Sequence, residues 1–230
     1  MIKDKVIIAL DVNTLKEEEK LLDMLSPHVQ VFKVGMELFY SCGTKAIDLV
    51  KKYDKDIFLD LKFHDISNTV YAASKAAVKF GAYMFNVHAS GGLEMMKKAV
   101  ESAEEESERL GISRPKILGV TVLTSIDSEA LKKTGINKSP EEQVLNLARL
   151  AKDAGLDGVV ASPEEISAIR KAMGKDFLIV TPGVRPEGGD VGDQKRIATP
   201  KEAFQRGADY IVIGRPITKA KYPVKVLESI

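Results

Sequence analysis

The sequence predicts an α/β protein that folds as a single (β/α)8 TIM barrel over residues 1–230, with its site at the C-terminal mouth of the strands. Short apolar runs of strand character alternate with helix-patterned segments about eight times, which is typical of parallel βα units. The runs are nearly continuous in apolar character, as expected for strands covered on both faces. Polar and ionisable residues cluster at the ends of these runs, and such positions converge at the mouth of a barrel.

The apolar runs are the expected strands, and they cover residues 6–10, 31–35, 57–61, 83–87, 117–123, 158–161, 177–180 and 210–213. About eight such units in 230 residues fit the usual size of this barrel. An open doubly wound sheet is the alternative closure. No G-x-G-x-x-G motif follows the first run, which weakens a dinucleotide-binding sheet. No shift of composition or Pro/Ser-rich linker marks a domain boundary.

Between the runs, apolar residues recur at the three-to-four spacing of amphipathic helices. The expected helices cover residues 15–25, 46–53, 70–80, 93–110, 141–154, 163–173 and 200–206. Thr14 is a plausible cap of the first helix. The pairs Ser139-Pro140 and Ser162-Pro163, each followed by two acids, predict helix starts with Ser as cap and Pro as the first helical residue. The long polar connection 125–139 is expected to be a local excursion.

Composition narrows the class of protein. The chain is 44% hydrophobic and 29% charged, and its net charge of +1 contains no block of like charge. This balance predicts neither a nucleic-acid surface nor a polybasic membrane patch. We also expect no membrane span and no signal peptide. Cys42 is the only cysteine, which excludes an internal disulfide and suits a reducing cytoplasm.

The most informative residues are two aspartates and two lysines near the ends of the second and third runs. Asp60 and Lys62 are two residues apart in a strand and should therefore share a face, and Asp65 follows where the strand becomes a loop. Lys33 lies inside another apolar run. Charges so close to a core are costly unless they are paired. These four groups could bind an anionic substrate, destabilise it by like-charge repulsion and donate a proton to it. The alternative is a structural ion-pair network.

Two later segments predict a phosphate site. Gly214 and Arg215 follow the last run, where a glycine lets backbone N–H groups approach a phosphate and arginine can bind it in bidentate fashion. The long Gly-rich loop after the seventh run predicts a lid over residues 183–194, with Arg185 and Gln194 as phosphate contacts at its two ends. The alternatives are an ordinary turn and a flexible connection. The three scattered histidines lack metal-ligand spacing, and local hydrogen bonding is the simpler role for each.

Together these residues resemble orotidine 5′-phosphate decarboxylases, in particular the bacterial branch of that family. The resemblance covers essentially the whole chain, in order, in segments 8–11, 32–35, 60–70, 122–125, 181–185, 192–196 and 213–217. One departure is Ser67, which stands where the family usually has proline. Proline would stiffen the chain entering the next helix, so Ser67 is expected to loosen the loop that carries Asp65 slightly.

The resemblance implies a cofactor-free and metal-free barrel that works as a homodimer, with its sites at the dimer interface. It implies that the enzyme decarboxylates orotidine 5′-monophosphate to UMP and CO2 in de novo pyrimidine biosynthesis. Lys62 would be the proton donor at C6, Asp60 would lie near the departing carboxylate, and Asp65 would reach into the partner subunit's site. The other implied substrate contacts are Asp11 and Lys33 at the ribose, Ile66 and Thr69 from the partner, Thr124 at the pyrimidine, and Arg185, Gln194, Gly214 and Arg215 at the phosphate, with Pro182 as a further substrate contact.

Two other functions compete with this one. A magnesium-dependent sugar-phosphate decarboxylase or aldolase of the hexulose-phosphate kind shares the barrel and an Asp-x-Lys-x-x-Asp motif. Those relatives tend to carry a metal-binding Glu at the position of Lys33, so a lysine there argues against magnesium. A catalytically silent phosphate-binding barrel is the second, and it would gain little from lysines near a core.

Overall fold

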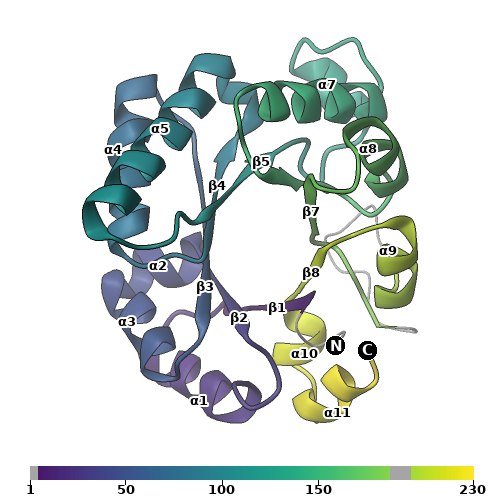
Figure 1. Cartoon of the computed structure of the whole chain (residues 1–230). Helices are drawn as coiled ribbons and strands as arrows, with labels where there is room; N and C mark the ends of the chain where they lie inside the picture. The colour runs from purple at the N-terminus through teal and green to yellow at the C-terminus, as the bar shows by residue number, and fades with distance from the viewer. Residues whose placement is uncertain (1–4, 187–197) are drawn as a thin grey trace.

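The computed structural model describes residues 5–186 and 198–230, and within them the strands close into a barrel in chain order. Every described strand pair is parallel, and β1 pairs with both β2 and β8. The ring of strands lies inside, and the helices surround it (Figure 1). The predicted barrel is confirmed, and the open doubly wound sheet is excluded.

The elements follow the expected alternation. They are β1 (Val6–Ala9), α1 (Leu15–Leu25), β2 (Val31–Gly35), α2 (Met36–Cys42), α3 (Thr44–Lys52), β3 (Asp56–Phe63), α4 (Ser67–Lys79), β4 (Met84–His88), the 3-10 turn η2 (Ala89–Gly91), α5 (Leu93–Leu110), β5 (Lys116–Val120), α6 (Ser128–Lys133), α7 (Pro140–Asp153), β6 (Gly158–Val160), α8 (Ile166–Met173), β7 (Leu178–Thr181), α9 (Pro200–Arg206), β8 (Tyr210–Ile213), α10 (Arg215–Thr218) and α11 (Pro223–Glu228).

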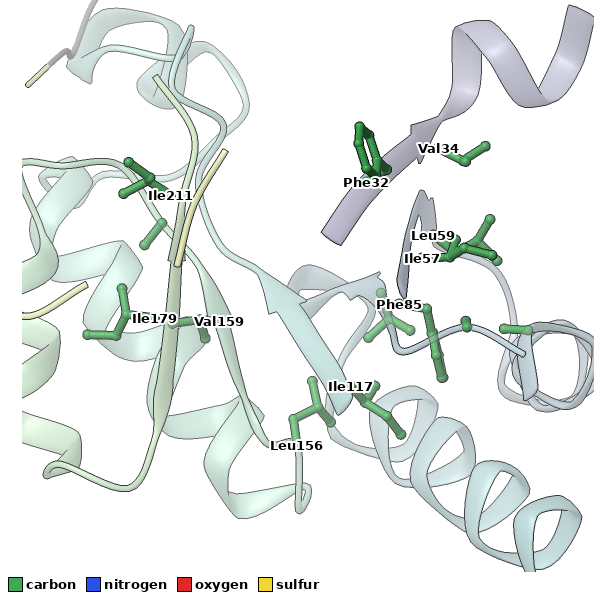
Figure 2. Packing of buried hydrophobic residues seen from close by; sticks show 14 of the residues in the cluster. Phe32, Val34, Ile57, Leu59, Phe85, Ile117, Leu156, Val159, Ile179 and Ile211 are labelled. Atoms are coloured by element: carbon green, nitrogen blue, oxygen red, sulfur yellow. The ribbon is translucent and has the colours of Figure 1, made fainter. Parts of the chain in front are cut away.

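The strands separate two apolar layers because successive side chains point to opposite faces. The outer layer packs between strands and helices, and Figure 2 shows part of it, including Phe32 on β2, Leu59 on β3 and Phe85 on β4. The inner layer fills the barrel itself and includes Phe58 and Met84. The barrel is thus a packed core, and the C-terminal ends of its strands are where this fold usually presents polar side chains to a ligand.

Several helix limits follow directly from capping. Helix α1 spans the expected residues, and Thr14 accepts a hydrogen bond from the Glu17 N–H. Ser139 and Glu142 form a reciprocal capping box at α7, and Pro140 is its first residue. The prediction for Ser162-Pro163 was wrong, because α8 begins only at Ile166. A tight turn closed from the Glu165 N–H to the Ser162 carbonyl precedes it instead.

The fifth strand also ends earlier than expected, at Val120 rather than at residue 123. Thr121 gives both its N–H and its hydroxyl to the Val160 carbonyl, at 3.2 and 2.9 Å, and the chain leaves the ladder there. The polar connection that follows contains α6, whose cap is Asp127. The short helices α2, α10 and α11 were likewise not predicted. They have four to seven residues, which show little helical period, and none of them has a side-chain cap such as the capping box of the equally short α9.

Strand β3 is irregular at its C-terminal end, which carries Asp60 and Lys62. Its pairing with β4 shifts register between Leu59 and Phe63. Within this interval Lys62 has a φ of 52°, in the left-handed region that non-glycine residues rarely adopt. Such strain persists only where surrounding contacts impose it.

The opposite, N-terminal end of the barrel is closed by polar contacts among interior side chains. Lys116 Nζ donates to the Tyr83 hydroxyl at 2.7 Å and lies 4.0 Å from the centre of that ring. The Tyr83 and Tyr210 hydroxyls are 3.0 Å apart. Lys116 is therefore an interior lysine at the end of the barrel away from the mouth.

No helix among the described residues is long and apolar enough to cross a membrane.

Helix α1 carries an unusual buried acid. Glu18 shares the core-facing side of the helix with Leu22 and Leu25, and its side chain is fully buried. Neither carboxylate oxygen has a hydrogen-bond partner among the described residues. Burial raises the pKa of Glu18 from 4.5 to about 8, so the group is protonated at neutral pH in the folded chain.

We expect Glu18 to make folding stability fall as the pH rises. Below pH 4.5 the Glu18 carboxyl is protonated in both the folded and the unfolded chain, so it does not change the free energy of unfolding with pH. Between pH 4.5 and about 8 it ionises in the unfolded chain only, and the free energy of unfolding falls as the pH rises. Above about pH 8 it is ionised in both states, and its contribution falls no further. The slope attributable to this group approaches about 1.4 kcal/mol per pH unit. Thermal unfolding of Glu18→Gln and of the native chain at pH 5, 7 and 9 should show a stability difference that moves in favour of the variant between pH 5 and 9. A difference that stays constant with pH would contradict it.

Candidate active site

The inward-facing ends of β2 and β3 bring together the charges that the sequence singled out. Lys33 Nζ lies 2.9 Å from Asp11 Oδ1 and 3.3 Å from Asp60 Oδ2. Lys62 Nζ lies 2.7 Å from the other Asp60 oxygen. Asp11, Lys33, Asp60 and Lys62 therefore form one continuous alternating network of charges at the mouth.

The network holds its charges against the cost of burial. Burial alone would raise the pKa of Asp60, but the ammonium groups of Lys33 and Lys62 outweigh it and hold that pKa below its usual value. Burial likewise disfavours the charged form of Lys33, but Asp60 and Asp11 outweigh it and raise the pKa of the lysine. Asp60 is therefore a carboxylate and Lys33 an ammonium across the neutral pH range.

Sequence reasoning missed a buried amide in this network. Asn86 on β4 donates from Nδ2 to Asp60 Oδ1 at 2.6 Å, and its Oδ1 accepts from the Lys62 backbone N–H at 2.8 Å. The signal was an inward position in β4 at which a polar residue interrupts an otherwise apolar run. The sequence alone does not separate such a residue from an ordinary strand residue.

Two glycines make room for the network. A Cβ on Gly35 would lie 2.6 Å from Lys33 Nζ, and a Cβ on Gly214 would lie 3.2 Å from Asp11 Oδ2. Gly35 ends β2 and Gly214 lies between β8 and α10. Any larger residue at Gly35 would have to displace the ammonium group of Lys33.

A pocket of about 190 Å³ opens beside these charges. Lys33, Asp60 and Lys62 contribute its charged side. Its other lining residues are mostly apolar and come from the inner ends of several strands and the loops after them: Phe58, Val120, Val122, Leu123, Thr124, Val160, Ala161, Pro182 and Val212. The arrangement suits a small ring that carries an anionic substituent toward the network.

The three residues that were expected to reach a partner's site lie apart from this pocket's lining. Asp65, Ile66 and Thr69 follow β3 and are exposed, with 73% of Ile66 accessible. Asp65 Oδ1 accepts from the Ile66 N–H at 2.6 Å. Ser67 is the first residue of α4, a position at which proline would be accommodated.

The expected phosphate residues come from the loops after β7 and β8. Arg185 is buried, and one of its guanidinium N–H groups donates to the Val184 carbonyl. Its backbone N–H donates to the Ala198 carbonyl at 2.9 Å, which brings the two flanks of the predicted lid together. Arg215 begins α10 and is exposed. Gln194 and most of the predicted lid lie outside the described residues.

Two histidines flank the network on its β4 side. The rings of His64 and His88 lie 5.4 Å apart. Burial, followed by the charges of His64 and Lys62, lowers the pKa of His88, which keeps it neutral at pH 7. No group of three or more His, Cys, Asp or Glu side chains within residues 5–186 and 198–230 is placed to hold a metal ion.

Comparisons with known proteins agree on one family. The model of the family described as "Orotidine 5'-phosphate decarboxylase / HUMPS family" matches residues 4–230. A protein from Moorella thermoacetica named orotidine 5′-phosphate decarboxylase is 54% identical over 99% of this chain and 91% of its own length. A protein of the same name from Geotalea uraniireducens is 54% identical over 98% of this chain and 93% of its own.

A solved structure agrees in fold as well as in sequence. The crystal structure of orotidine 5′-phosphate decarboxylase from Lactobacillus acidophilus has a TM-score of 0.87 and 43% identity, and the match covers 98% of this chain and 96% of that one. The likeness thus runs through all eight βα units and the segments between them. The chain belongs to the orotidine 5′-phosphate decarboxylase / HUMPS family.

Proposed function

We propose that this chain is a carboxy-lyase that converts orotidine 5′-monophosphate to UMP and CO2, with Lys62 as the proton donor at C6. The activity is the one named for its full-length relatives. The observation that carries the residue assignment is the alternating network of Asp11, Lys33, Asp60 and Lys62 beside a mostly apolar pocket.

The reaction needs placed charge. When the bond between C6 and the carboxylate breaks, its electron pair stays on C6 and CO2 leaves. The ring cannot delocalise that charge well, so preorganised cationic groups must stabilise it. The ammonium group of Lys62 lies at the pocket wall, where it can oppose the developing charge and then give its proton to C6. Asp60 in turn places a negative charge where the substrate carboxylate would lie, which stresses the bound anion.

The remaining residues position the substrate. Asp11 and Lys33 contact the ribose, and Thr124 and Pro182 lie against the pyrimidine. The phosphate lies far from C6, and it is bound by Arg185, Gln194, Gly214 and Arg215. Binding energy from a remote group of this kind accelerates chemistry when it fixes the reacting ring in place.

The main rival is magnesium-dependent chemistry of the hexulose-phosphate kind. Lys33 counts against it, since its ammonium group lies between the Asp11 and Asp60 carboxylates and neutralises the oxygens that a divalent cation would need. We expect purified protein to remove orotidylate absorbance at the same rate with and without EDTA. Loss of turnover in EDTA that Mg²⁺ restores would favour the rival, and no turnover of orotidylate in either condition would refute the proposed activity.

The working unit is a homodimer in which Asp65, Ile66 and Thr69 complete the partner's site. The exposed apolar side chains at the barrel mouth support this assembly, because Tyr40, Ile66 and Leu123 follow the C-terminal ends of three different strands. Asp65, which precedes Ile66 in the chain, is exposed as well. Covering this face with a second copy would bury the apolar side chains and bring a further carboxylate toward the network.

Mixing two inactive variants tests the shared site. Lys62→Ala and Asp65→Ala should each be inactive alone. After the two are mixed and allowed to exchange subunits, half of the sites in each mixed dimer combine an intact Lys62 with an intact Asp65. Activity should return to about a quarter of the native value, since about half of the dimers are mixed. No recovery, with exchange verified by mass spectrometry, would place Asp65 in its own subunit's site.

We place the enzyme in the cytoplasm. A single cysteine, Cys42, suits a reducing compartment, since disulfides belong to oxidising ones. No membrane or nucleic-acid partner is part of the proposal.

A further inference from the structure

Asn86 is the one amide among the buried polar side chains of the described residues, and it bridges two groups of the candidate site. Its side-chain N–H donates to Asp60 Oδ1, and its side-chain oxygen accepts from the Lys62 backbone N–H. The two bonds hold the first and last residues of the three-residue segment that carries the carboxylate and the ammonium group. Only 1% of Asn86 is exposed, so its two hydrogen bonds are shielded from bulk water.

The Asn86 side chain supplies the hydrogen-bond partner of the Lys62 backbone N–H. The φ of 52° at Lys62 takes the N–H out of the regular ladder, in the interval where the β3–β4 register shifts. A buried N–H without a partner costs about 1–3 kcal/mol. The amide oxygen of Asn86 supplies that partner, and it thereby stabilises the left-handed conformation from which the Lys62 side chain reaches Asp60.

We propose that Asn86 is a positioning residue that holds the Lys62 backbone and the Asp60 carboxylate in register for proton delivery. The proposal rests on the roles of Lys62 and Asp60 in the proposed function. Asn86 is not one of the pocket-lining residues; it acts through its two neighbours. Its removal should lower kcat and leave the affinity for UMP almost unchanged, since the phosphate contacts lie in other loops.

An amide is required because the position needs one donor and one acceptor at once. An ionised carboxylate of the same shape would accept from the Lys62 N–H but could not donate to Asp60. It would also place two negative charges in hydrogen-bond contact, and such a pair binds a proton more tightly than either acid alone. Protonation would restore a donor.

The groups around Asn86 favour proton binding by an aspartate at this position. On β5, the residue paired with Asn86 is the apolar Leu118. The titratable and charged groups around the position come from β2, β3, the start of the following loop and β4, and they are Lys33, Asp60, Lys62, His64 and His88. Of these, Asp60 alone is an acid that contacts the Asn86 side chain in the described structure.

The test compares Asn86→Asp and Asn86→Ala with the native chain. Both variants should lose about 100-fold in kcat at pH 8, the loss expected for a small misplacement of a reacting group. Activity of Asn86→Asp should recover as the pH falls toward 5, through an ionisation that the native profile lacks, and Asn86→Ala should not recover. Rates are expressed per UMP-binding site, so that unfolded protein does not count.

Ser102→Ala is the matched control, since Ser102 is equally buried, lies on α5 outside the ring of strands and donates to the Tyr71 carbonyl at 2.6 Å. It should lose stability without losing kcat. An Asn86→Asp profile parallel to the native one, or native kcat in both Asn86 variants, would overturn the inference. Lys62→Ala is measured alongside: if it retains turnover, the proton-donor role of Lys62 in the proposed function fails, whereas an inactive Lys62→Ala with native kcat in both Asn86 variants refutes the positioning role alone.

Discussion

Replacing Lys62 with alanine is expected to lower turnover of orotidine 5′-monophosphate by about 10⁴-fold or more, since it removes the proposed proton donor, which is also the cation proposed to oppose the developing charge. UMP binding should remain measurable, because the proposed ribose and phosphate contacts come from other residues. The variant also leaves Asp60 with one ammonium partner, Lys33, in place of two. The measurement is single-turnover decay of orotidylate absorbance, with UMP affinity determined by calorimetry.

Lys116→Ala provides the control for the loss of an interior lysine. Lys116 points into the same barrel from β5, but its ammonium group contacts Tyr83 at the N-terminal end. Its replacement should alter stability and leave kcat near the native value. Turnover of Lys62→Ala within tenfold of native would remove the lysine from the chemistry, whatever the control does.

We expect Arg215→Ala to slow the reaction of the nucleotide and to leave the reaction of the nucleoside almost unchanged. With orotidine 5′-monophosphate, kcat/KM should fall about 100-fold, the scale of a lost charge-assisted contact. With orotidine, which has no phosphate, the slow reaction should proceed at nearly the native rate, because the contact does not exist for that substrate. The comparison uses the same absorbance assay with both substrates at equal concentration.

Lys219 supplies the matched control for Arg215. It lies at the other end of α10 and is also exposed. Lys219→Ala removes one positive charge at the C-cap of the same short helix and should leave both reactions unchanged. Equal losses for nucleotide and nucleoside in Arg215→Ala would show that the arginine supports the fold and does not bind phosphate.

Much of the barrel is visible in the sequence because its rules are local. Apolar runs bounded by polar residues define the strands, and caps such as Thr14 and Ser139 define helix starts. Errors arise where a local signal is satisfied in another way. Ser162 has the pattern of a cap, yet its carbonyl closes a tight turn and the helix begins four residues later.

The charged part of the site was predictable for a topological reason. In a closed parallel barrel the C-terminal ends of all strands meet, so polar residues at the ends of two runs must converge. The prediction that Asp60 and Lys62 lie together is confirmed, but regular alternation is not the whole reason, since the strand is distorted at Lys62. The assigned roles of these residues stay predictions.

Asn86 could not be found in the same way. Its importance comes from a backbone N–H that leaves the ladder, and no residue type signals that event in β3. Asp65 presents a different difficulty. Its proposed site lies on another copy of the chain, and the physics of one chain does not specify the surface that meets it.

The left-handed residue in β3 has a consequence for evolution as well as for chemistry. Glycine would adopt this conformation without the steric cost that lysine bears there, about 1–2 kcal/mol, but it would give up the ion pair with Asp60. The chain therefore carries backbone strain at the residue to which we assign the proton transfer. Directed evolution of this scaffold should couple every round to a turnover assay, since selection for heat resistance alone does not protect a strained functional residue.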